Sequence, residues 1–226
     1  MAEDDRRSAD TARLDAFVDA AFAFAVGLLV VTSGSPDSLD DLRSLLWASP
    51  AFAFSFALLM IFWAAHRHYG RMAPRRDGTS FVLSLAVVFA VLMFVYPLRL
   101  LSQAMVRFLS GGTIVSGPTL TRWNDLELLY VVYGLFFAVL AGLTAALFLH
   151  AVRAADRVGL TDKPAAREQA GRWAVIGAVG GVSAATALLI PLSTAPWLPG
   201  AVYWLIPILM GLWRLVFRPP PPAAPA

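Results

Sequence analysis

Residues 13–33, RLDAFVDAAFAFAVGLLVVTS, place charged side chains at one end of a long apolar run. No side chain from Ala20 to Val31 is polar. A helix rises about 1.5 Å per residue, so the segment from Leu14 to Gly34 is long enough to cross a hydrocarbon layer of about 30 Å. Asp19 would then lie about one turn inside the membrane, where a carboxylate costs at least about 2.5 kcal/mol. The sequence therefore predicts a membrane-spanning helix whose buried carboxylate faces protein or water.

Helical spacing divides this segment into two faces. One face carries mostly apolar and aromatic side chains, with Ala20 and Gly27 filling the spaces between them: Arg13, Phe17, Phe24, Leu28 and Val31. The second face carries both carboxylates: Asp15, Asp19, Phe22, Ala23, Val26 and Val30. Apolar stripes in membrane helices usually face lipid or another helix, so spacing alone gives little support to a pore-lining role.

The composition is that of an integral membrane protein, because 58% of the 226 residues are hydrophobic and only 15% are charged. The absence of cysteine excludes disulfides, thiolate metal sites and cysteine nucleophiles. Arginine supplies 17 of the 18 basic residues, which together with abundant alanine indicates a GC-rich bacterial source. These basic residues lie between apolar segments, where they report membrane topology, and they do not predict a nucleic-acid partner.

We expect an all-α, polytopic membrane protein with a short polar tail at residues 1–12, disordered or leading into a helix. A six-helix membrane domain at 13–217 follows, and then a proline-rich tail at 218–226. A short helix starting near Pro36 should lead into the second span, and residues 99–109 have the spacing of a separate interfacial helix. Residues 153–172 are expected to form a basic loop. The six predicted spans are about 14–34, 47–65, 79–98, 128–149, 173–192 and 195–217.

Loop charge predicts the orientation of such a chain. Fourteen of the 18 basic residues fall on one side of the six spans and four fall on the other. The positive-inside rule therefore places both termini in the cytoplasm. The first span then begins where the second ends, so Asp19 and His66 lie at similar depth. We expect Asp19 to be partnered by His66, or by Arg13 or Arg67.

Two motifs resemble a known family. Arg13-x-x-x-Phe17-x-Asp19 before an apolar run resembles the first-helix Arg-x-x-x-Phe-Ser-Asp signature of the transmembrane protein 175 family. This family comprises endolysosomal potassium channels and their shorter bacterial relatives. The stretch FWAAHRHYGR at 62–71 resembles the aromatic and histidine-rich end of that family's second helix. Val18 departs from the signature, because it replaces the serine.

The resemblance implies a homotetrameric, potassium-permeable cation channel in the bacterial plasma membrane, lined by the first helix and needing no cofactor. Bulky apolar side chains would form its narrowest part, and Phe24 stands at the family's key constriction position, five residues after the motif aspartate. The implied pore-lining set is Phe24, Gly27, Leu28 and Val31, and the implied structural brace is Arg13, Phe17, Asp19 and His66. Relatives often carry Thr or Ser at the position of Gly27, so Val18 and Gly27 weigh against strong potassium selectivity.

Other functions stay open at this point. Proline-interrupted fifth and sixth spans favour a small secondary, proton-coupled transporter, and the departures from the motif favour a non-conducting scaffold. Enzyme chemistry is not expected, since the three histidines lack metal-ligand spacing and no nucleophile motif occurs. The filter sequence Thr-Val-Gly-Tyr-Gly is absent, and Gly177-x-x-x-Gly181 predicts close helix packing. Asp37, Asp40 and Asp41 either concentrate cations outside the membrane or form a solvated loop.

Overall fold

The structure is a computed structural model that describes residues 2–31, 38–114 and 122–216, and all of its regular elements in these ranges are helices. This confirms the all-α fold class. The elements are α1 (Ala2–Val31), α2 (Leu39–Trp47), α3 (Ser49–Met72), α4 (Gly78–Leu109), α5 (Trp123–Arg153), α6 (Ala155–Val158), α7 (Lys163–Leu189), α8 (Leu198–Ala201), the 3-10 helix η1 (Val202–Trp204) and α9 (Leu205–Val216).

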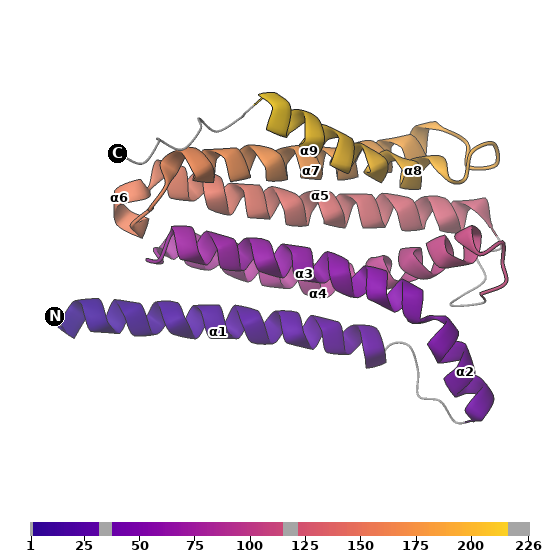
Figure 1. The fold of residues 1–226 in the computed structure, drawn as a ribbon, viewed down its shortest axis with the longest axis horizontal. Helices are drawn as coiled ribbons and strands as arrows, with labels where there is room; N and C mark the ends of the chain where they lie inside the picture. Colours follow the sequence, from indigo (N-terminus) through magenta and orange to yellow (C-terminus); the bar gives the residue numbers. More distant parts are fainter. Residues whose placement is uncertain (1, 32–37, 115–121, 217–226) are drawn as a thin grey trace, which may run out of the picture.

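The long helices lie side by side along one axis (Figure 1). α1 forms one edge, α3 and α4 follow together, and α5 and α7 lie beyond them. α1 contacts both α3 and α4, while α5 packs on α4 and most extensively on α7. The beginning of α1, the turn between α3 and α4, and the short α6 lie at the same end of the bundle. We call this the α6 end.

Five helices in the described ranges are long and apolar enough to cross a membrane, and the apolar segment Leu198–Trp213 is shorter. These six segments correspond to the six predicted spans. The expected helix before the second span is α2, which begins at Leu39. Residues 32–37, including Pro36 and Asp37, and the predicted tail at 218–226 lie outside the described residues. Residues 2–12 are the first turns of α1, so the helix-leading alternative for the tail holds.

The separate interfacial helix predicted at 99–109 is wrong, because α4 continues through Pro97 as far as Leu109. Proline removes one backbone donor and usually bends a helix, but neighbouring helices make it tolerable inside a membrane span. Pro97 is buried among such neighbours. With 32 residues, α4 is therefore longer than a helix needs to be to cross a hydrocarbon layer.

The basic loop predicted at 153–172 is also wrong over most of its length. The single turn of α6 ends at Gly159, whose φ of +63° is a left-handed conformation that glycine adopts without strain. The Asp162 side chain then accepts a hydrogen bond from the Ala165 N–H, and Pro164 occupies the first turn of α7. These are strong helix-start signals, so α7 begins at Lys163, well before the expected Trp173.

Glycines allow α5 and α7 to approach closely. A Cβ atom added to Gly180 would lie 2.8 Å from Phe137 Cδ1 and 2.9 Å from the Gly134 carbonyl oxygen. Gly177 is likewise buried, close to the Ala138 carbonyl, whereas no atom lies within 4 Å of a Cβ added to Gly181. The predicted packing face of the fifth span therefore exists, but Gly180 takes the contact assigned to Gly181.

Candidate functional site

One face of α1 is buried by the rest of the chain. Its large members belong to the main hydrophobic core together with side chains of α3 and α4. Because these residues recur at helical spacing, they hold α1 against the bundle along most of its length. The buried residues are Leu14, Val18, Phe22, Ala25 and Leu29. Val18, which replaces the motif serine, is fully buried, so this departure from the motif alters core packing.

The opposite face of α1 has no cover within the described chain. Phe24 is 60% exposed and Val31 is 74% exposed, although both are large and apolar. A Cβ added to Gly27 would have no neighbour within 4 Å. Leu28 differs from the other three predicted pore residues, because it lies at the edge of this face and packs partly against the core. We call Phe24, Gly27 and Val31, with the half-exposed Phe17, the free face of α1.

Asp19 has a partner, but it is none of those predicted. The Trp63 indole N–H of α3 donates to Asp19 Oδ1 over 2.8 Å, and the Arg67 guanidinium lies over the same indole ring, 5.1 Å from its centroid. The first two spans are therefore tied together as expected, through an aromatic donor. Trp63 lies in the second motif, three residues before His66. Its indole N–H could therefore have been considered as a donor to Asp19 from the sequence.

His66 instead joins α3 to α4. It is 4% exposed, and its Nε2 lies 3.1 Å from the Ser84 hydroxyl oxygen. Arg13 also faces away from Asp19, since it is exposed and its Nη1 lies 3.8 Å from Asp10 Oδ1. The four residues of the predicted brace therefore do not form one cluster in this chain.

A second ion pair connects α1 to the turn between α3 and α4. Arg76 Nη2 lies 2.7 Å from Asp15 Oδ1, and only 5% of the Arg76 side chain is exposed. The same guanidinium donates to the Ala73 carbonyl and stacks over the Tyr69 ring. Gly70 gives it room, because a Cβ there would lie 3.0 Å from Arg76 Nη2.

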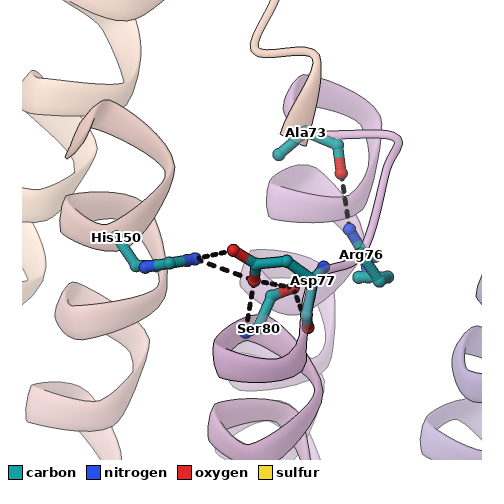
Figure 2. Close-up of polar contacts among 5 residues, drawn as sticks. All are labelled: Ala73, Arg76, Asp77, Ser80 and His150. Atoms are coloured by element: carbon teal, nitrogen blue, oxygen red, sulfur yellow. Dashed lines mark hydrogen bonds and ion pairs between the residues drawn. The ribbon is translucent and has the colours of Figure 1, made fainter. Parts of the chain in front are cut away.

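The neighbouring residue, Asp77, reaches in the other direction (Figure 2). His150 Nε2 of α5 lies 2.9 Å from Asp77 Oδ1 and 3.0 Å from Oδ2. Asp77 and Ser80 also form a capping box at the start of α4. Burial by itself would raise the pKa of the Asp77 carboxyl, but the Ser80 N–H and hydroxyl and the His150 ring outweigh it and hold the pKa below its ordinary value.

The turn 73–77 thus links α1, α4 and α5 at the α6 end of the bundle. Sequence reasoning missed these two pairs, because it assigned Arg76 to topology and left His150 without a partner. The pattern Asp77-x-x-Ser80 before an apolar run was a readable capping signal. Nothing in the spacing indicated His150 or Asp15 as partners, since both lie more than 60 positions away along the chain.

A hollow of about 630 Å³ opens between α1 and the start of α4 at this same end. Its apolar wall includes Leu14, Phe17 and Phe81, and its polar rim includes Arg13 and Arg76. The motif residues Arg13 and Phe17 therefore share one surface feature, and Asp19 binds Trp63 instead. Among the described residues, no three His, Cys, Asp or Glu side chains come together to hold a metal ion.

The fold and the free face of α1 define the class as an all-α membrane protein with several spans. Residues 13–96 match the family described as the endosomal/lysosomal potassium channel TMEM175. A curated potassium channel of Marivirga tractuosa is 31% identical over 138 residues, which is 57% of this chain and 54% of that protein. The likeness to this family lies in residues 13–96 and in the part of the chain that aligns with the Marivirga protein.

A further relative and two solved structures show the same likeness. A potassium channel of Chamaesiphon minutus is 30% identical over 105 residues, 43% of this chain and 52% of that protein. This chain thus spans about half the length of the curated relatives it matches. The solved structure of a variant of the potassium channel MtTMEM175 has a TM-score of 0.75 at 24% identity, over 90% of this chain and 92% of that one. The solved structure of a TMEM175 homologue from Chamaesiphon minutus has a TM-score of 0.62 at 22% identity. That match covers 90% of this chain and 97% of the homologue.

Proposed function

We propose that this chain is one subunit of a potassium-permeable cation channel, with a pore lined by the free face of α1. The observation that carries the proposal is that α1 buries one face in the core of its own subunit and leaves large apolar side chains, Phe24 and Val31, uncovered on the other. A second argument comes from the relatives, which are described as potassium channels.

In this proposal, four copies assemble in the plasma membrane around a central axis and bring their α1 helices together. Phe24 forms the main constriction, with Val31 about two turns further along the pore and Leu28 at the edge of the lining. A narrow apolar ring passes ions only when it is wetted, so it gates conduction without a carbonyl filter. Gly27 presents no hydroxyl to replace ion hydration, and we therefore expect weak discrimination between potassium and sodium.

The test is potassium flux into liposomes that carry the purified protein. Phe24→Ala should increase the flux or reduce ion discrimination, because the side chain that narrows the pore is shortened. Leu135→Ala is the matched control, since Leu135 is a similarly exposed apolar residue of α5. The control should behave as the unmodified protein does. Equal incorporation is checked by protein recovery from the liposomes.

Two results would overturn the proposal. Absence of flux in every variant would favour a non-conducting scaffold. Saturating, proton-coupled uptake would favour a secondary transporter, whose support here is that the last apolar segment is broken into α8, η1 and α9. A channel instead follows the ion gradient, with a reversal potential set by the permeant ions.

A further inference from the structure

α4 carries a stripe of polar residues near its C-terminal end, at the end of the bundle opposite α6. Arg99, Gln103 and Arg107 are four residues apart, so they lie above one another on one face of the helix. The described chain provides no acceptor for Arg99 Nε or Arg107 Nη1, although both atoms are buried. The Gln103 side-chain oxygen is also buried without a donor, and that residue is only 7% exposed.

These groups are costly unless something binds them. An unpaired guanidinium at the edge of a hydrocarbon layer loses hydration, and a buried amide without partners loses about 1–3 kcal/mol. Elsewhere in the described chain, buried polar groups at the same depth do find partners; for example, Ser102 and Ser55 hydrogen-bond over 2.8 Å. The stripe is therefore a candidate for a ligand that supplies acceptors to both arginines.

The depth of the stripe identifies the kind of ligand. From Gly78 at the α6 end to Arg99, α4 rises about 32 Å at about 1.5 Å per residue, which matches the hydrocarbon thickness of about 30 Å. Arg99 then stands at the opposite boundary, and Gln103 and Arg107 lie in the headgroup layer. Phosphate groups are the negatively charged acceptors that this layer offers, and arginine binds phosphate in a two-pronged geometry.

The same face of α4 is apolar below the arginines. Phe89 is 65% exposed and Tyr96 is 52% exposed, and both fall on the helical stripe that continues into Arg99, Gln103 and Arg107. An uncovered aromatic wall that ends in two guanidinium groups matches a molecule with hydrocarbon chains and a phosphate head. Basic sites beside membrane helices bind lipid headgroups in this way.

We propose that Arg99 and Arg107, with Gln103 between them, form a binding site for the phosphate group of a membrane phospholipid, whose chains lie along Phe89 and Tyr96. The site is separate from the free face of α1, and it does not depend on whether the protein conducts ions. A bound lipid would give acceptors to the exposed part of each half-buried arginine and hold the far end of α4 at the membrane surface.

The test uses dioleoylphosphatidylglycerol added to the detergent-purified protein, with bound lipid counted by native mass spectrometry. Arg99→Gln with Arg107→Gln should weaken retention at least about tenfold, since about 1.4 kcal/mol of lost binding is a factor of ten. Arg43→Gln with Arg122→Gln removes the same charge from two exposed arginines and should leave retention unchanged. Arg99→Lys with Arg107→Lys should retain an intermediate amount and keeps the test valid if the glutamine variant does not fold.

A second measurement needs no variant. Phosphatidylglycerol should raise the thermal midpoint of the unmodified protein more than dioleoylglycerol, which has the same chains and no phosphate. Equal effects of the two lipids on the thermal midpoint would overturn the proposal. It would also be overturned if millimolar inorganic phosphate displaced bound phosphatidylglycerol as effectively as added phosphatidylglycerol does. Loss of the oligomer in the glutamine variant with unchanged lipid retention would also overturn it, because the arginines would then bind a neighbouring copy.

Discussion

At the scale of single residues, Arg76 and Asp77 are adjacent in the chain and bind different helices. Arg76 pairs with Asp15 of α1, and Asp77 pairs with His150 of α5. Each pair has one partner in the same short turn, so the turn positions α1 and α5 relative to the start of α4. The contribution of each pair to the free energy of unfolding depends on how deeply the pair is buried.

Arg76→Met should therefore lower the thermal midpoint of the detergent-solubilised protein. The substitution leaves Asp15 and the Ala73 carbonyl without the guanidinium, at a cost of about 2 kcal/mol for a largely buried, charge-assisted contact. Arg71→Met is the matched control, because Arg71 is an exposed arginine in the last turn of α3. Equal midpoints for the two variants would show that the Asp15 pair contributes no stability.

Asp77 should make stability depend on pH. Its pKa is lowered by folding, so its charge stabilises the folded state above its ordinary value of 3.8, and this contribution is lost as the pH falls through the lower folded pKa. Asp77→Asn keeps a capping side chain but removes the charge. The unmodified protein should have the higher thermal midpoint at pH 7. The difference between the two proteins should shrink and disappear as the pH falls below 3.8.

The control for this titration is Asp156→Asn, since Asp156 is exposed on α6. Its midpoint should follow that of the unmodified protein from pH 7 to pH 3. A difference between unmodified protein and Asp77→Asn that is the same at every pH would assign the effect to the lost shape of the carboxylate and not to its charge.

At the scale of elements, the contact between α5 and α7 depends on glycines that allow the two backbones to touch. Gly180→Ala should destabilise the protein by about 2 kcal/mol, because the new Cβ would lie 2.8 Å from Phe137 Cδ1 in a packed interface. Gly181→Ala is adjacent on the same helix and meets nothing within 4 Å, so it should be neutral or gain up to about 1 kcal/mol of helix propensity. Thermal midpoints of the two variants, measured side by side, decide the point. Similar losses in both would contradict it.

The sequence predicted elements well wherever local chemistry decides structure. Apolar length alone locates the spans, because a membrane helix must satisfy its backbone internally. Two boundaries were wrong for reasons that single-residue rules miss. Pro97 reads as a helix end but lies buried among helices that tolerate it, and the charged stretch before Trp173 reads as a loop although Asp162 caps it as a helix.

The candidate site was predicted less completely than the spans. Helical spacing separated the face of α1 that carries Phe24 and Val31, and the structure leaves that face uncovered. The predicted partner of Asp19 was wrong, since a carboxylate near arginine and histidine suggests an ion pair, whereas the Trp63 indole donates the hydrogen bond. Pairs such as Asp77 with His150 arise from tertiary packing, and helical spacing within one segment does not contain them.

At the scale of the whole molecule, the basic residues are concentrated at one of the two ends of the helix bundle. α6 and the turn 73–77 lie at one end of the bundle together with the start of α1 (Figure 1), and most of the 18 basic residues fall in these segments or in the adjoining ends of α3, α5 and α7. The C-terminal end of α4 lies at the other end. The positive-inside rule then predicts that the α6 end is cytoplasmic and that both termini share that side.

Cysteine labelling tests this orientation cleanly, because the chain contains no cysteine of its own and the unmodified protein gives no background. Thr113→Cys and Asp156→Cys introduce single thiols at exposed positions near opposite ends of the bundle. A membrane-impermeant maleimide added to intact cells should label Thr113→Cys and should reach Asp156→Cys only after the membrane is permeabilised. The reverse pattern would invert the orientation. Labelling of both positions from outside would mean that they do not lie on opposite sides of the membrane, and it would contradict the six-span arrangement on which the pore proposal depends.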